Sequence, residues 1–269
     1  MLKRNTKTFG AMLLLVICLI AIFLLFSRKS EATSALPINS EIQKMLDYLG
    51  IENCAITRLP DYKDIHAELT PVTVTEQEVK EYVDEILDIY GRETLSDDFV
   101  KKELEANSIE DYYQDVKREL MAGKEVEVLM RVRNRIIDNL IKDSVFSLPE
   151  DNVAKYSVEI VKSYENEALV YQMELEEYID QELQMTKKGF FDMCYNEGEK
   201  YIKSYLVVGA IAEKEALTVT KKDITEFSDF RKDKSTNFSD EAKAYISYQI
   251  LENKVYDMFI ENKGKDTKK

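Results

Sequence analysis

The sequence of 269 residues has no tryptophan, a single histidine, four prolines and eight glycines. Glycine and proline weaken helices, so their scarcity beside abundant Glu, Lys, Leu and Ile is typical of a mainly helical protein. The composition argues against a β-sandwich, a collagen-like fibre or a disordered chain. One histidine excludes a histidine-rich metal centre and a catalytic site with two histidines. We expect this residue, His66, at the surface.

Positive charge is also scarce. The chain has 51 Asp and Glu residues against 37 Lys and Arg residues, which gives a formal net charge of −14. A broad basic face that could bind phosphates is therefore not expected, and we predict no nucleic-acid partner.

Motifs that carry catalytic chemistry are missing from the sequence. It contains no glycine-rich phosphate loop, no Gly-x-Ser-x-Gly, no His-Glu-x-x-His and no Cys-x-x-Cys. Cys54 and Cys194 lack metal-ligand spacing, so they either pair in an oxidising compartment or are two small buried hydrophobic residues. We predict no catalytic residues, no metal and no cofactor.

The first 37 residues differ from the rest. Residues 9–26 form an uncharged apolar run with basic residues on both sides. Eighteen residues of helix rise about 27 Å, close to the thickness of a hydrocarbon core. We predict an uncleaved signal anchor in a single-pass protein of the cell membrane, with the large domain outside the cytoplasm. A signal cleaved near Ala32 or Ala35 and a lipoprotein at Cys18 are the alternatives.

Capping patterns and apolar periodicity divide the body of the chain into helices. A short helix over residues 38–50 ends at Gly50, and residues 55–74 alternate as a strand or an extended linker would. Thr75 and Glu78 predict a capping box at the start of the next helix, which ends at Gly91. Residues 147–150 (SLPE) predict a second capping box before a long helix.

Another long helical segment runs from Ser108 to about residue 143. Its apolar face rotates by over half a turn beyond Gly123. This rotation predicts either a kink near Gly123 or two halves that are buried on different sides.

The helix after residue 150 is expected to continue to residue 178 with apolar residues on two faces. Val158, Leu169 and Met173 lie roughly opposite a stripe of tyrosines, counting 100° per residue. A helix that is apolar on two faces is buried on both or exposes one for a partner. We expect the tyrosine stripe to be core (Tyr156, Tyr164, Tyr171, Tyr178).

Short motifs between residues 58 and 262 resemble, in order and spacing, those of the bacterial trigger factor chaperones. LPDYKDI at residues 59–65, VTVTEQEV at 72–79 and LSDDF at 95–99 resemble the passages that flank this family's isomerase domain. LPE at 148–150, VGAIAEKE at 208–215, VT at 219–220 and YISYQIL at 245–251 resemble its C-terminal helical domain.

Two departures separate the sequence from the family's pattern. Only residues 88–94 lie between the segments that would flank the FKBP-type isomerase domain, so that domain looks excised. The apolar anchor replaces the ribosome-docking N-terminal domain, so we do not expect a ribosome partner. What remains looks like the helical substrate cradle that SurA-type chaperones and the foldase PrsA also resemble, without their parvulin domains.

The apolar run at residues 9–26, the composition and the resemblance together predict a mainly all-α fold. It would have an N-terminal transmembrane helix, a short extended linker and an elongated multi-helix chaperone domain. We divide the chain into a cytoplasmic tip and signal anchor (1–37), a helix, linker and first arm helix (38–94), a helical chaperone-like domain (95–262) and a disordered tail (263–269).

The resemblance implies a chaperone, and the apolar run at residues 9–26 predicts that it is anchored in the membrane. It would bind unfolded or newly exported polypeptides on an apolar helical cradle, and our hypothesis places Val158, Leu169 and Met173 in contact with these clients. Two alternatives stay open. One is a structural adaptor of a cell-envelope complex, and the other is a family member with residual peptidyl-prolyl isomerase activity.

Overall fold

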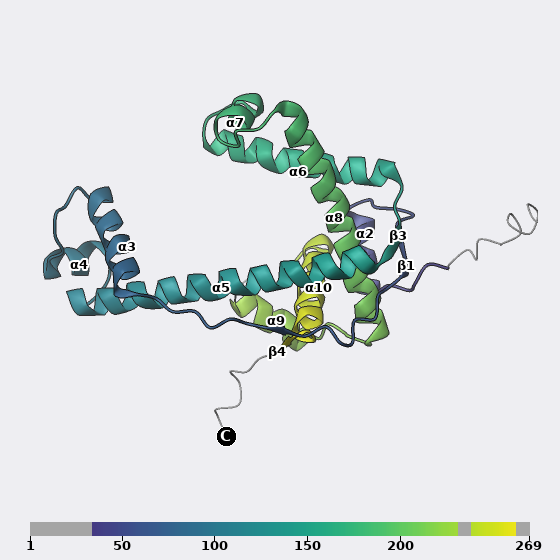
Figure 1. The fold of residues 1–269 in the computed structure, drawn as a ribbon, viewed down its shortest axis with the longest axis horizontal. Coiled ribbons are helices and arrows are strands. Elements are labelled where there is room, and N and C mark those ends of the chain that lie inside the picture. Colours follow the sequence, from purple (N-terminus) through teal and green to yellow (C-terminus); the bar gives the residue numbers. More distant parts are fainter. Residues whose placement is uncertain (1–33, 231–237, 262–269) are drawn as a thin grey trace, which may run out of the picture.

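Helices make up most of the chain that the computed structural model describes, residues 34–230 and 238–261. Figure 1 shows a body, a head at the far end of the long helix α5 (Ile109–Asp143), and an arm that projects from the body. Strands β1 (Ala55–Arg58) and β3 (Val145–Ser147) pair antiparallel, and strands β2 (Ala67–Glu68) and β4 (Ile260–Glu261) pair parallel. The elements are α2 (Ser40–Tyr48), β1 (Ala55–Arg58), β2 (Ala67–Glu68), α3 (Glu76–Ile89), α4 (Asp97–Glu103), α5 (Ile109–Asp143), β3 (Val145–Ser147), α6 (Glu150–Val170), α7 (Leu175–Gln181), α8 (Lys187–Lys214), α9 (Lys221–Phe230), α10 (Asp240–Asp257) and β4 (Ile260–Glu261).

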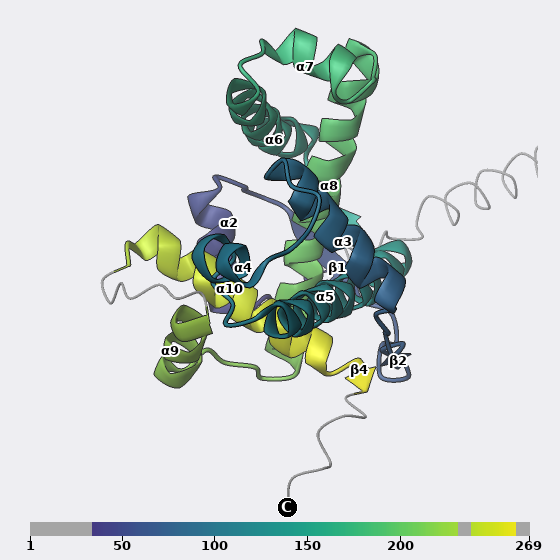
Figure 2. The same cartoon turned by 90° about the vertical axis from the view of Figure 1, so that its left-hand side faces the viewer.

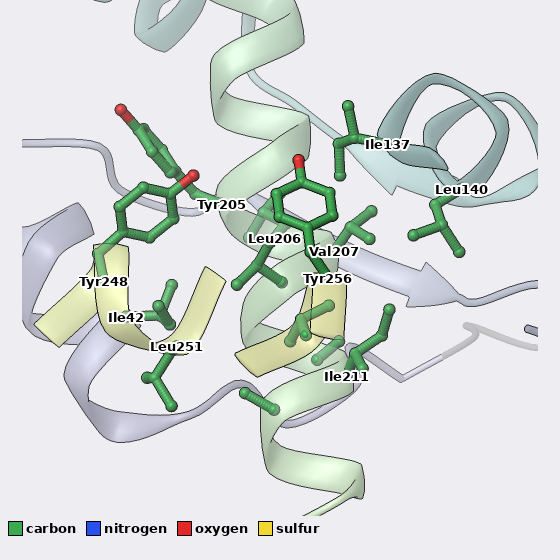
Figure 3. Packing of buried hydrophobic residues seen from close by; sticks show 14 of the residues in the cluster. Ile42, Ile137, Leu140, Tyr205, Leu206, Val207, Ile211, Tyr248, Leu251 and Tyr256 are labelled. Atoms are coloured by element: carbon green, nitrogen blue, oxygen red, sulfur yellow. The ribbon is translucent and has the colours of Figure 1, made fainter. Parts of the chain in front are cut away.

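The body is built around helix α8. Its residues 204–212 are all buried, because α2, α5, α10 and strand β1 pack around this part of the helix. Figure 3 shows Ile42 and Leu251 on one side of α8, and Ile137 of α5 on the other. Helix α2 approaches the backbone of α8 at Gly209, where a Cβ atom would lie 3.1 Å from the Ile42 side chain. A larger residue at this position would push the two helices apart.

The head consists of α3, α4 and the first half of α5, which enclose a separate apolar core. Helix α3 begins with the predicted capping box: the Glu78 amide donates to Thr75 Oγ1 (3.2 Å), and the Thr75 amide donates to the Glu78 carboxylate (2.8 Å). Lys124 of α5 donates to this carboxylate and to the Thr73 carbonyl. The start of α3 is thereby tied to α5.

Helix α5 connects the head to the body as one helix of 35 residues, which corresponds to a length of about 52 Å. Tyr112 and Val116 lie in the core of the head, whereas Ile136 and Leu140 lie in the core of the body. The helix is continuous through Gly123, and Figure 1 shows α5 as a straight rod. Of the two alternatives, burial of the two halves on different sides is confirmed, and the kink is wrong.

The arm consists of α6, α7 and the first part of α8, and it rises away from the body when viewed from the head (Figure 2). Its small core holds Ile179, Phe190 and Cys194. Helix α6 ends at Val170, because Gln172 adopts a left-handed conformation (φ 58°). The amides of residues 172 and 173 then donate back to the carbonyls of residues 169 and 168, as in a Schellman motif. The predicted continuation of this helix to residue 178 is wrong.

The predicted capping box at residues 147–150 is also wrong. Pro149 is the N-cap of α6, and no side chain caps this helix. Ser147 lies instead in strand β3, where it pairs with Ala55 of β1. Ser147, which the local pattern assigned to the helix cap, is therefore part of a strand pair.

The transmembrane part of the predicted fold class is corrected. None of the helices in residues 34–230 and 238–261 is long and apolar enough to cross a membrane. The architecture of the described residues is mainly helical.

Two predicted segments, the signal anchor at residues 9–26 and the disordered tail at 263–269, lie outside the described residues. The domain limits and the extracytoplasmic location stay predictions.

Candidate functional site

The far end of the arm exposes three consecutive apolar side chains, which we call the arm tip. Leu169 and Val170, the last residues of α6, are 69% and 79% exposed, and Tyr171 beside them is half-exposed. Single exposed apolar residues are ordinary on protein surfaces, whereas neighbouring ones form a surface that can bind a partner.

The structure separates the three residues that the sequence placed on one helix face. Val158 is 51% exposed and lies 11 positions before Leu169, so at 100° per residue the two are within about 20° of each other around α6. Met173 follows the end of α6 and is half-buried. Two of the three residues therefore share an exposed face, and their role in binding stays a prediction.

The four tyrosines of the predicted core stripe have different surroundings. Tyr164 packs edge-on against Phe190 in the arm core, with ring centroids 5.2 Å apart. Tyr178 is buried but belongs to α7, and it contacts the half-exposed ring of Tyr171 at 5.5 Å. Tyr156 is half-buried at the base of the arm. The core prediction is confirmed for Tyr164 and Tyr178 and wrong for Tyr171.

The arm is acidic as well as apolar. Residues 159–184 contain eight Asp and Glu residues and a single lysine, Lys162. This lysine pairs with Glu159 at 2.8 Å, so it does little to offset the other carboxylates. Dense negative charge keeps an exposed apolar surface soluble, because copies of the arm repel one another.

A row of tyrosines connects the base of the arm to the body, and two of them, Tyr205 and Tyr248, are buried. The hydroxyls of Tyr156 and Tyr205 are hydrogen-bonded at 2.8 Å, and the Tyr205 ring packs edge-on against Tyr248 of α10 at 4.8 Å (Figure 3). Half-exposed Tyr201 contacts Tyr156 at 6.1 Å. Burial raises the pKa of Tyr156 and of Tyr205 above the usual range, so both hydroxyls stay protonated. Helical spacing alone assigns residues 201 and 205 to the core, which holds for buried Tyr205 but not for half-exposed Tyr201.

In the part of the chain that the structure describes, no group of three or more His, Cys, Asp or Glu side chains could hold a metal ion. Cys54 and Cys194 are free thiols in separate cores, and burial raises the pKa of both. Burial also raises the pKa of Glu252, which accepts a hydrogen bond from the Tyr248 hydroxyl (2.6 Å). His66 is exposed, as predicted.

A groove of about 460 Å³ runs between helix α5 and the extended linker that follows β2. Val126, on the α5 side, is 58% exposed. The sequence predicted the extended linker, but the groove depends on the packing of this linker beside α5. Its lining is Leu69, Thr70, Pro71 and Val72 from the linker, and Ala122, Glu125, Val126, Val128 and Leu129 from α5.

A comparison with known proteins finds one family that matches the arm and most of the body. The family model for the C-terminus of bacterial trigger factor protein matches residues 108–261, which run from the start of α5 to β4. The chain is 27% identical over 197 residues to the trigger factor of Halothermothrix orenii, covering 68% of this chain and 45% of that protein. It is 28% identical over 190 residues to the trigger factor of Finegoldia magna, covering 65% and 42%.

The chain thus spans less than half the length of these curated relatives. No solved structure matches it. The family model, however, covers more than half of the 269 residues and includes the complete arm and most of the body. The resemblance that the motifs indicated is therefore confirmed, and this chain belongs to the bacterial trigger factor family, whose C-terminal part it matches.

Proposed function

We propose that this chain binds unfolded polypeptides as a chaperone-like protein and releases them without covalent chemistry. Membership of the trigger factor family supports a role in protein folding. The observation that carries the proposal is the arm tip, where Leu169, Val170 and Tyr171 are exposed at the end of an acidic arm.

Apolar contact suits a partner without fixed structure, because the hydrophobic effect has no preferred direction. Burying one side chain the size of valine or leucine contributes about 1.5–3 kcal/mol. A few such contacts only partly offset the cost of ordering the bound segment, so the complex stays weak. Weak binding leaves the client free to dissociate, as it must in order to fold. Half-exposed Tyr201 at the arm base adds aromatic surface to the arm.

The test measures how well the chain suppresses aggregation. A chemically unfolded test protein is diluted into buffer, and light scattering reports its aggregation over time. The double variant Leu169→Ser/Val170→Ser should lose much of the protection, while its melting temperature stays close to that of the wild type because both side chains are exposed. Ile89→Ser on α3 is the matched control, since Ile89 is 76% exposed but belongs to the head. Full protection by the double variant would contradict a role of the arm tip.

The range of bound partners separates this proposal from the adaptor alternative. A chaperone-like protein should retain many different unfolded proteins, and the double variant should lose them together. Retention of one folded partner at a fixed stoichiometry would favour the adaptor instead.

A further inference from the structure

The linker between β2 and α3 has backbone groups that the described chain does not use. Before it, the Ala67 amide donates to the Phe259 carbonyl (2.7 Å) in the β2–β4 pair. After it, the Thr73 carbonyl accepts from Lys124 (2.8 Å). Between these two points, residues 70–72 make no hydrogen bond with any described residue. Thr70 and Val72 therefore keep free N–H and carbonyl groups, whereas Pro71 has no N–H to donate.

The free backbone borders the groove between the linker and α5. Leu69 and Val72 form one wall and are half-buried, and Val126 on the other wall is 58% exposed. An open, extended backbone beside an apolar groove is the arrangement to which a further strand can add, since its hydrogen-bonding groups and its side-chain contacts are both vacant.

The charge of the groove also constrains what fits in it. Glu125 is the charged residue in the lining, and it has no ion-pair partner in the described chain. Lys124 beside it is already held by Glu78 and the Thr73 carbonyl. The groove therefore favours a positive charge next to apolar side chains.

We propose that an extended segment of an unfolded polypeptide adds as a strand along residues 69–72. Alternate apolar side chains of the segment enter the groove, and a lysine or arginine lies beside Glu125. Backbone hydrogen bonds supply affinity whatever the sequence, and the groove selects for apolar residues at every second position. This inference rests on the proposed function and deepens it, because it specifies the conformation and the chemistry of one client segment.

The test uses the full chain and a fluorescein-labelled octapeptide of alternating valine and threonine that carries one lysine. Fluorescence anisotropy measures binding. Val126→Asp puts a carboxylate into the groove at an exposed helical position and should weaken binding about tenfold or more. Ile89→Asp, which makes the same change at an exposed position of α3, should bind like the wild type.

Backbone N-methylation tests whether the peptide binds as a strand. Two octapeptides are methylated at opposite sets of alternate residues, so each lacks the N–H donors of one edge only. The N–H groups of alternate residues in a strand point to opposite edges. Methylation of the set that faces residues 69–72 should therefore weaken binding about tenfold or more, and methylation of the other set only slightly. Equal effects of the two sets, or wild-type affinity of Val126→Asp, would overturn the inference.

Light scattering distinguishes a failure of this inference from a failure of the proposed function. A wild-type chain that suppresses aggregation but does not bind the octapeptide overturns strand addition and leaves the proposed function in place. A wild-type chain that does not suppress aggregation overturns the proposed function itself.

Discussion

In the body, nine consecutive residues of α8 are buried by helices from distant parts of the sequence, whereas in the arm the core is formed around Ile179, Phe190 and Cys194. The same helix, α8, contributes to both regions. In the body its apolar residues face neighbours on all sides. In the arm, apolar residues of the partner helix α6 stay exposed at its end.

This difference separates stability from binding. A residue enclosed by several elements contributes to the free energy of unfolding of the whole molecule, whereas an exposed one contributes little and stays available to a partner. A small core also lets the arm open locally at a lower cost than the body. The predictions below test this separation, from the largest expected effect to the smallest.

Leu206→Ala should have the largest effect. Leu206 is fully buried in the body core, and removing its side chain leaves a cavity that costs about 2–5 kcal/mol. Denaturant titration should show the loss for the whole molecule. The milder Leu206→Val serves if the first variant does not fold. A free energy of unfolding like that of the wild type would contradict the body as the main source of stability.

Phe190→Leu should have a smaller effect that is confined to the arm. Phe190 packs against Tyr164 and Phe191, and losing these ring contacts costs about 1–2 kcal/mol. Hydrogen exchange should become faster in α6 and α7, while protection of residues 204–212 stays unchanged. Equal acceleration in the body would show that the two regions unfold together.

Acid should loosen α9 from α10 in the body. The Asp223 carboxylate accepts hydrogen bonds from Lys254 (2.8 Å) and from the Thr220 amide (2.7 Å), and these bonds lower the pKa of Asp223 to about 2. Because the folded pKa lies below the unfolded value of about 4, the stabilisation is present above pH 4 and is lost as the pH falls towards 2.

Hydrogen exchange of α9 measures this loss as a function of pH. In Asp223→Asn the exchange of α9 should be faster at neutral pH and should change less between pH 4 and pH 2. A variant with the pH dependence of the wild type would assign the effect to other carboxylates.

The triple variant Val158→Ser/Leu169→Ser/Met173→Ser should have the smallest effect on stability. Exposed substitutions change the free energy of unfolding by about 0.5 kcal/mol or less each, which applies to Val158 and Leu169, and half-buried Met173 adds slightly more. Melting temperature and light scattering are measured on the same sample. Unfolding of the variant would show that this face of α6 is core, and full protection of a client would show that it does not bind.

Local features of this fold were predictable from the sequence because they involve residues close together in the chain. The capping box of Thr75 and Glu78 needs only three residues of separation, and it was confirmed. The ends of α2 and α3 follow from Gly50 and Gly91, which adopt positive φ angles that glycine tolerates best. The end of α6 was missed because Gln172, which is not glycine, takes the same conformation there.

The binding surfaces were less predictable, because exposure is a property of the whole fold. Helical spacing placed Val158 and Leu169 on one face, and the structure leaves this face exposed. Helical spacing could not place Met173, because this residue follows the turn after α6. Nor could it show that Tyr171 is half-exposed while Tyr164 packs on Phe190.

The sequence by itself determined the helical class, the starts of α3 and α5, and the family, because periodicity, caps and motifs involve residues that are close together in the chain. The tertiary structure alone decided which apolar faces are covered. Helix α5 is one continuous helix, yet its two halves are buried in two different cores, because different elements pack against each half. Likewise Ser147 joins a strand rather than a cap because β1, about 90 positions earlier, provides a hydrogen-bonding edge that the local pattern does not contain.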